Sequence, residues 1–139
     1  MTGVWVVLAV LAAATVLGFL LRGRDGRVRR SKPAADLPAQ VRDLIDPASP
    51  VTLVQLSTTF CAPCRHTRVI LSDLASRTDG LEHRELDLTD MPEVATSLKV
   101  LRTPTTVAYA PDGAELLRVG GVPRRDVLVE ALRPHLARP

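Results

Sequence analysis

The 139-residue sequence predicts an α/β fold in which a central mixed sheet is flanked by helices and preceded by one N-terminal transmembrane helix. Three observations support this fold class: a long uncharged segment at the N-terminus, an alternation of predicted strands and helices, and a predicted hairpin followed by a last helix. Alternation favours parallel strands joined by crossover helices, whereas a hairpin adds an antiparallel strand. The length allows one domain with a short appendage.

The N-terminal segment Gly3 to Leu21 contains nineteen residues and no charge. As a helix it would span roughly 28 Å, close to the hydrocarbon thickness of a bilayer. A cleavable signal peptide, the alternative, would carry its basic residues before the apolar run, and here they follow it. We therefore predict a permanent anchor over residues 1–21, in a single-pass protein of the cell membrane.

Basic residues crowd directly after the anchor, at Arg22, Arg24, Arg27, Arg29, Arg30 and Lys32. Because basic flanks stay on the cytoplasmic side, the N-terminus should lie outside and the rest of the chain in the cytoplasm. Without this cluster the chain is net acidic, so the net charge of +3 gives little support to nucleic-acid binding. Residues 22–36 read as a basic juxtamembrane linker, and residues 37–139 as the folded domain.

The first half of the domain should contain two helices and two strands. Asp36 to Ile45 predicts a short helix with Asp36 as its cap, and Val51 to Ser57 predicts a strand that is buried on both faces. A helix should run from Cys61 to about Arg77, and a second strand from Leu81 to Leu88.

The second half of the domain should contain a helix, a hairpin and a final helix. In "DMPEVATSL" the pair Asp90 and Glu93 has capping-box spacing. "TTVAYA" and "AELLRVG" flank the turn signal "PDG", which predicts a hairpin. The run "RRDVLVEALRPHL" has apolar residues at helical spacing, which predicts a helix near the end of the chain.

Cys61 and Cys64 are the only cysteines in the sequence, and their Cys-x-x-Cys spacing permits three interpretations. A zinc site needs four ligands, and the histidines at His66, His83 and His135 are widely scattered. A structural disulfide closing so short a loop would stabilise the fold weakly, and a cytoplasmic location would tend to keep it reduced. The third interpretation is a redox-active dithiol.

The redox interpretation explains the most residues. A strand ending at Ser57 leads into a helix that begins near Cys61, where the unpaired N–H groups and the helix dipole stabilise a thiolate. Cys64 should lie one turn further on, on the same face and less exposed. Attack by Cys61 on a disulfide would form a mixed disulfide, which Cys64 could resolve. Pro63 is tolerated because first-turn N–H groups have no helical partner.

The stretch "VTLVQLSTTFCAPCR", followed by "LRTPTTVAYAPDG" and "VGG", resembles the thioredoxin family from about Val51 to Leu136. The resemblance implies a thioredoxin-like fold, with Cys61 as the nucleophile and Cys64 as the resolving thiol. It also implies that Pro104 is a cis-proline beside the dithiol, and that the backbone of Thr103 pairs with an extended substrate. The substrate groove that it implies comprises Phe60, Ala62, Pro63, Thr103, Pro104 and Gly120.

Four positions depart from the pattern usual in this family. Phe60 stands where tryptophan usually precedes the first cysteine, and Ala62 stands where glycine is usual. Gln55 takes the position of the buried acid, and Glu85 that of a nearby lysine. Glu85 is therefore a candidate acceptor for the Cys64 proton, acting through a water with a pKa raised by partial burial. The alternative is that Glu85 is a solvated residue of an edge strand.

The predicted anchor and the resemblance together indicate a membrane-anchored thiol-disulfide oxidoreductase, for which no metal or organic cofactor is implied. Its partners would be a disulfide-containing protein or small molecule, a reductase that supplies electrons, and the membrane through Gly3 to Leu21. One rival is an extracytoplasmic thiol reductase of the type that serves cytochrome c maturation. A rival of another class is a tethered binding module whose cysteines do not cycle.

Overall fold

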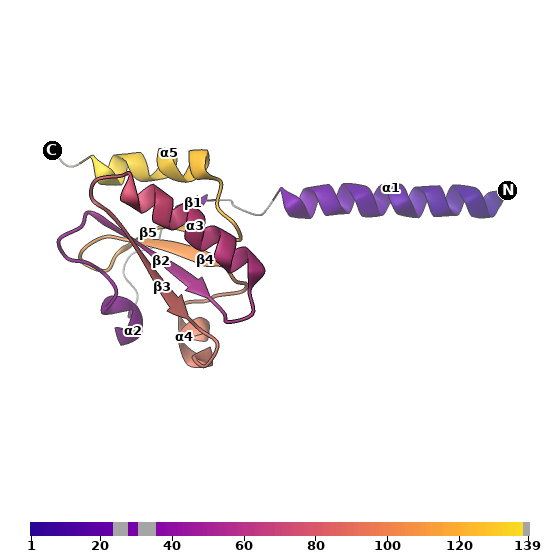
Figure 1. The fold of residues 1–139 in the computed structure, drawn as a ribbon. Helices are drawn as coiled ribbons and strands as arrows, with labels where there is room; N and C mark the ends of the chain where they lie inside the picture. The colour runs from indigo at the N-terminus through magenta and orange to yellow at the C-terminus, as the bar shows by residue number, and fades with distance from the viewer. Residues whose placement is uncertain (24–27, 31–35, 138–139) are drawn as a thin grey trace.

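The computed structural model describes residues 1–23, 28–30 and 36–137 (Figure 1). The elements follow one another in the order α1 (Thr2–Arg22), β1 (Val28–Arg30), α2 (Ala39–Arg42), β2 (Val51–Ser57), α3 (Ala62–Ser76), β3 (Leu81–Asp87), α4 (Pro92–Ser97), β4 (Thr105–Tyr109), β5 (Glu115–Gly120) and α5 (Arg125–Leu136). This is the predicted α/β architecture, a mixed sheet with helices on both faces and an apolar helix before it.

The described strands form one sheet in the order β1-β5-β4-β2-β3. β2 and β3 are parallel and are joined through α3, whereas β4 pairs antiparallel with both β2 and β5. Both the predicted crossover and the predicted hairpin are therefore present. Three strand termini lie side by side at one end of the sheet: β2 ends at Ser57, β4 begins at Thr105 and β5 ends at Gly120. We call this the dithiol end of the sheet, because Cys61 follows β2 there.

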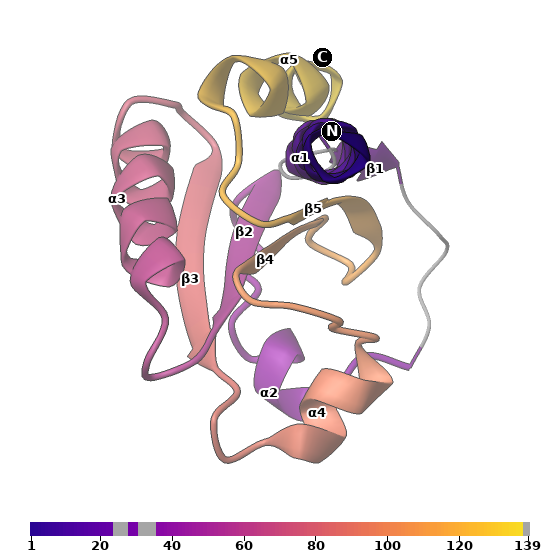
Figure 2. The same cartoon turned by 90° about the vertical axis from the view of Figure 1, so that its right-hand side faces the viewer.

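Helices cover both faces of the sheet, and the alternation of β2 divides its side chains between them (Figures 1 and 2). Val51 and Leu53 pack in a cluster that includes Leu71 of α3 and Leu128 of α5. Val54 and Leu56 belong to the second cluster, which includes residues of α2 and α4. All seven residues of β2 are buried, as the continuous apolar run predicts.

Two predicted helix starts are wrong. The helix expected from Asp36 is the four-residue α2, which begins after Pro38, and it has no side-chain cap. Proline disfavours helical geometry in the residue before it, which keeps Leu37 out of the helix. The Asp90 and Glu93 capping box is also absent, because α4 has Met91 at its N-cap and Pro92 at its first position.

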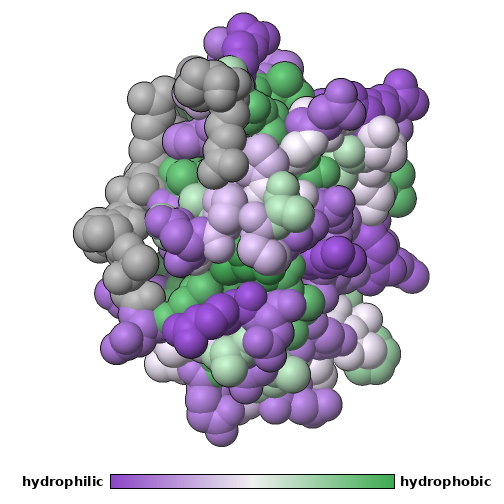
Figure 3. Space-filling view, turned by 90° about the vertical axis from the view of Figure 1, so that its left-hand side faces the viewer, coloured by the Kyte–Doolittle hydropathy of each residue, from purple (hydrophilic) through white to green (hydrophobic). Residues whose placement is uncertain are grey.

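α1 projects from the domain, and none of its residues is buried (Figure 1). It is long and apolar enough to cross a membrane. The end of the domain that faces away from α1 is mostly hydrophilic, with several hydrophobic areas between the polar side chains (Figure 3).

The predicted linker contains a strand that the sequence did not indicate. β1 pairs antiparallel with β5, with Val28 opposite Val119 and Arg30 opposite Leu117. Its three residues show too short a pattern to predict, and the pairing comes from the open backbone edge of β5. The other linker residues, 24–27 and 31–35, lie outside the described part of the chain.

Candidate active site

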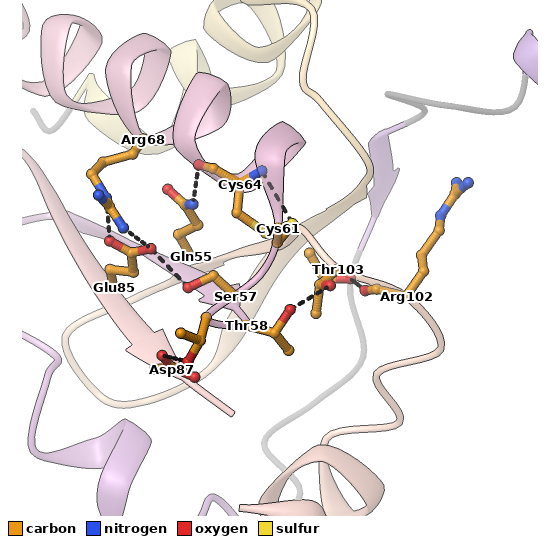
Figure 4. The surroundings of a disulfide bond; sticks show 12 residues. Gln55, Ser57, Thr58, Cys61, Cys64, Arg68, Glu85, Asp87, Arg102 and Thr103 are labelled. Carbon is orange, nitrogen blue, oxygen red and sulfur yellow. Dashed lines mark hydrogen bonds and ion pairs between the residues drawn. A yellow bond between two sulfur atoms is a disulfide. The ribbon is translucent and has the colours of Figure 1, made fainter. Parts of the chain in front are cut away.

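Cys61 and Cys64 form a disulfide at the start of α3, with their Cα atoms 5.2 Å apart (Figure 4). Cys61 is the N-cap residue, and its Sγ accepts a hydrogen bond of 3.2 Å from the backbone N–H of Cys64. Cys64 is 2 % exposed, whereas Cys61 is partly exposed. The expected difference in access between the two sulfurs is therefore present. The N–H of Cys64 and the positive end of the helix dipole favour the Cys61 thiolate after reduction.

Behind Cys64, Gln55 is fully buried and makes two hydrogen bonds. Its Nε2 donates to the carbonyl oxygen of Cys64 over 2.8 Å, and its Oε1 lies 3.2 Å from Nε2 of His83. Because Oε1 can only accept, Nε2 of His83 carries the hydrogen. His83 Nδ1 then accepts from the Ser72 hydroxyl, 3.1 Å away. Burial lowers the pKa of His83, which favours the neutral ring that this network requires.

Glu85 lies opposite Gln55 in the parallel pairing of β2 and β3, and it forms a bidentate ion pair with Arg68. The Arg68 Nε to Glu85 Oε2 distance is 2.5 Å, and Ser57 donates a hydrogen bond of 2.7 Å to Oε1. The hydrogen bond from Arg68 holds the pKa of Glu85 below its usual value, and the bond from Ser57 lowers it further. The expected rise in the pKa of Glu85 is therefore wrong, because these donors outweigh partial burial.

A pocket of about 420 Å³ opens beside the disulfide, on the side of α3 and β3. It is lined by Ser57, Thr58, Thr59, Cys61, Cys64, Arg65, Arg68, Glu85 and Asp87. Glu85 and Cys64 thus border one polar space, in which a water could connect them. The loop before Cys61 is fixed at this pocket because Thr59 donates from its backbone to Thr89 and from its hydroxyl to Asp87.

The segment that carries Thr103 and Pro104 reaches the dithiol end of the sheet, and Thr103 lies near Cys61 (Figure 4). The peptide bond between Thr103 and Pro104 is cis, and the carbonyl of Pro104 accepts a bond of 2.8 Å from the N–H of Gly121. Gly121 has a φ of 81°, a conformation that favours glycine. A Cβ atom on Gly120 would lie 3.1 Å from Nε of Arg102, so this strand end passes close to the segment before Pro104.

Two apolar side chains in the loops before Cys61 and before Thr103 are exposed. Phe60, directly before Cys61, is 98 % exposed. Leu101, two residues before Thr103, is 97 % exposed. The hydroxyls of Thr58 and Thr103 lie 3.4 Å apart, which links the loop before Phe60 to the segment before Pro104. Ala62 and Pro63 are exposed in the first turn of α3.

The polar contacts between α3 and β3 were not predicted from the sequence. Cys64, Arg68 and Ser72 are spaced four residues apart, so they share one face of α3. His83 and Glu85 are two residues apart, so they share one face of β3. Matching these two periodicities would have paired Arg68 with Glu85 and Ser72 with His83. Within the described residues, no three His, Cys, Asp or Glu side chains are grouped so that they could hold a metal ion.

An α/β sheet that presents a Cys-x-x-Cys pair at a helix N-terminus, with one sulfur accessible and one buried, defines a thiol-disulfide oxidoreductase. The family model for thioredoxin matches residues 36–134. The chain belongs to the thioredoxin family.

Individual thioredoxins agree with this assignment. Thioredoxin from Staphylococcus saprophyticus is 32% identical over 89 residues, which cover 63% of this chain and 85% of that protein. Thioredoxin from Staphylococcus haemolyticus is 33% identical over the same length. Among solved structures, thioredoxin from Fasciola hepatica superposes with a TM-score of 0.59 at 26% identity, covering 70% of this chain and 92% of that one. A mutant thioredoxin from Halobacterium salinarum gives a TM-score of 0.63 at 22% identity, covering 73% of this chain and 88% of that one, and supports the fold.

Proposed function

We propose that this chain is a membrane-anchored thioredoxin that reduces protein disulfides on the cytoplasmic face of the cell membrane. The observation that carries the membrane assignment is α1, an apolar helix that the domain does not bury. Exposure of so many apolar side chains to water would be unfavourable, whereas a bilayer would accommodate them. The basic residues after Leu21 support the cytoplasmic placement of the domain.

In the proposed reaction, the Cys61 thiolate attacks one sulfur of a substrate disulfide. A bond forms between Cys61 and that sulfur, and the second substrate sulfur leaves as a thiolate. Cys64 then attacks Cys61, which releases the first substrate sulfur and forms the Cys61–Cys64 disulfide seen in the structure. The substrate gains two electrons and the dithiol loses two. A partner reductase must return the dithiol to its reduced form.

The groove beside Pro104 would hold the substrate during this exchange. The residues proposed to contact it are Phe60, Ala62, Pro63, Thr103, Pro104 and Gly120. The exposure of Phe60 leaves an apolar surface available for a substrate segment. Thr103 lies directly before the cis bond, at the position that would pair with an extended backbone.

Glu85 is the proposed acceptor for the Cys64 proton, through a water in the shared pocket. Its carboxylate is ionised at neutral pH and is therefore able to accept a proton. The ion pair with Arg68 lowers its pKa, however, which makes it a weaker base than an unpaired carboxylate. We therefore expect Glu85 to accelerate resolution only modestly.

Thiol labelling in intact cells tests the membrane assignment and the orientation together. The chain should sediment with membranes, and an impermeant thiol reagent should label reduced Cys61 only after the cells are permeabilised. Labelling of intact cells would instead place the domain outside, as in the extracytoplasmic rival. Replacement of the six basic residues by neutral ones should mix the two orientations. Recovery of the chain in the soluble fraction would contradict the anchor.

A further inference from the structure

The strand β1 determines which end of the domain lies next to α1. β1 runs antiparallel to β5, and Val28, its first residue, pairs with Val119. Val119 precedes Gly120, which is opposite Thr105 in the next strand pair. The chain that leaves α1 therefore enters the domain at the dithiol end of the sheet. Figures 1 and 2 show α1 and the N-terminus of α3 on the same side of the domain.

The connection between α1 and β1 is short. α1 ends at Arg22 and β1 begins at Val28, so six Cα-to-Cα steps separate the two residues. Even a fully extended chain covers only about 20 Å over six steps. A folded domain of about 100 residues has a radius of gyration of about 13 Å, so the connection is shorter than the domain is wide. The connection therefore cannot carry the dithiol end far from the end of α1.

The dithiol itself is close to the entry point of the chain. Three strand spacings separate β1 from β2 in the order β1-β5-β4-β2. At about 4.8 Å for each spacing, the lateral separation is about 14 Å. α1 has 21 residues and is about as long as a bilayer core is thick, which places Arg22 at the membrane surface. Cys61 should therefore lie within one or two radii of gyration of the domain, about 13 to 26 Å, from the lipid headgroups.

We propose that the short connection and the pairing of β1 with β5 hold the dithiol end of the sheet at the membrane surface, and that the preferred substrate is a disulfide in the juxtamembrane segment of another membrane protein. This inference rests on the proposed membrane anchor. Because the dithiol is tethered at the membrane surface, its effective concentration is high for disulfides that lie in the same narrow layer beside the membrane. Phe60, directly before Cys61, is 98 % exposed and is therefore accessible to a partner in that layer. The opposite end of the domain is mainly hydrophilic (Figure 3).

Two insertion variants of the full-length chain test the proposal. A flexible Gly/Ser insertion of about 20 residues after Gly23 would lengthen the connection by roughly 25 Å. The matched control carries the same insertion between β1 and α2, after Lys32, where it leaves the connection between α1 and β1 unchanged. Both variants keep the dithiol and every residue of the domain. Sedimentation with the vesicles reports whether each chain is anchored.

The substrates are two single-pass membrane proteins in the same vesicles, one with a disulfide about five residues from its membrane segment and one with the same disulfide about 40 residues away. The pre-reduced chain reacts in a single turnover, so no reductase is needed. The parent and the control should reduce the near disulfide about tenfold faster than the distant one, and the variant with the long connection should lose most of this preference. If the parent and the long-connection variant show the same preference for the near disulfide, with both chains in the vesicle pellet, the inference is overturned and the membrane anchor still stands. A chain that stays in the supernatant would overturn both the anchor and the inference.

Discussion

The side-chain amide of Gln55 donates a hydrogen bond of 2.8 Å to the backbone carbonyl of Cys64. This bond joins the central strand β2 to the first turn of α3, where both sulfurs of the disulfide lie. Gln55 takes the place of an acid in the familiar pattern, and it cannot accept a proton from Cys64 at neutral pH. Its observed contacts instead give it a positioning role, shared with His83 on the neighbouring strand.

Replacement of Gln55 by leucine should destabilise the oxidised protein by about 1–3 kcal/mol. Leucine has a similar size, but the change leaves the Cys64 carbonyl and the His83 ring N–H buried without their partner. Urea unfolding of the full-length chain in detergent would measure the loss. Gln40→Leu is the matched control, because Gln40 is exposed on α2 and should tolerate the change. Equal stabilities of the two variants would show that the buried bonds contribute nothing.

Replacement of Glu85 by glutamine should slow the resolution of a mixed disulfide by about tenfold or less. The effect should be smaller than the roughly 100-fold that is common for a general base, because Arg68 lowers the pKa of this carboxylate. Single-turnover release of substrate thiol would measure the rate, and the initial attack by Cys61 should change little. Glu82→Gln removes the same charge from the other face of β3 and should leave both steps intact. An unchanged rate of resolution in Glu85→Gln across pH 6 to 9 would assign the proton to solvent or to the departing thiolate.

The Arg68 ion pair should make stability depend on acid pH. Because the pKa of Glu85 is lower in the folded chain than its ordinary value of 4.5, the unfolded chain takes up the proton first as the pH falls. The stabilisation is therefore complete above about pH 5 and is lost as the pH falls through the folded pKa. Arg68→Gln should reduce stability at pH 7 only slightly, because the pair is partly exposed and solvent screens it. Urea titrations should show that this difference between the parent and the variant disappears near pH 2. A difference of constant size at both pH values would contradict an electrostatic origin.

His83 should remain neutral to a lower pH than an exposed histidine. Burial lowers its pKa from the ordinary value of 6.5, so the unfolded chain binds a proton in a range where the folded chain does not. His83 therefore lowers stability as the pH falls below about 6.5. Nitrogen NMR of the labelled ring should show the Nε2–H form at neutral pH and a pKa below 6.5. The Nδ1–H form would contradict the hydrogen bond to Gln55.

The sequence predicted most of the fold because its strands and helices have clear periodicities. The continuous apolar run of β2 and the "PDG" turn led to a buried strand and a hairpin that the structure contains. Short elements were harder to predict from the sequence. β1 has three residues and depends on the edge of β5, while Pro38 and Pro92 moved two helix starts beyond their expected caps.

At the site, the sequence identified the two cysteines because their spacing and place at a helix start are local properties. It did not identify the partners of Gln55 and Glu85. Those contacts join residues that are 9 to 28 positions apart, so they depend on how α3 packs against β2 and β3. The sign of the Glu85 pKa shift followed from that packing. Partial burial alone would raise the pKa, and the hydrogen bond from Arg68, together with the one from Ser57, reverses the direction.

In the proposed mechanism, Cys61 attacks a substrate disulfide and Cys64 resolves the mixed disulfide that forms. Covalent trapping by the two single-serine variants tests this division of labour most directly. Each variant of the full-length chain is incubated in membranes with disulfide-containing proteins, and the adducts are separated by non-reducing electrophoresis. Cys64→Ser should accumulate mixed disulfides that disappear with a reductant, because the attacking thiol is accessible and the resolving thiol is missing. Cys61→Ser should form almost none, because Cys64 is buried. Equal trapping by both variants would contradict the account.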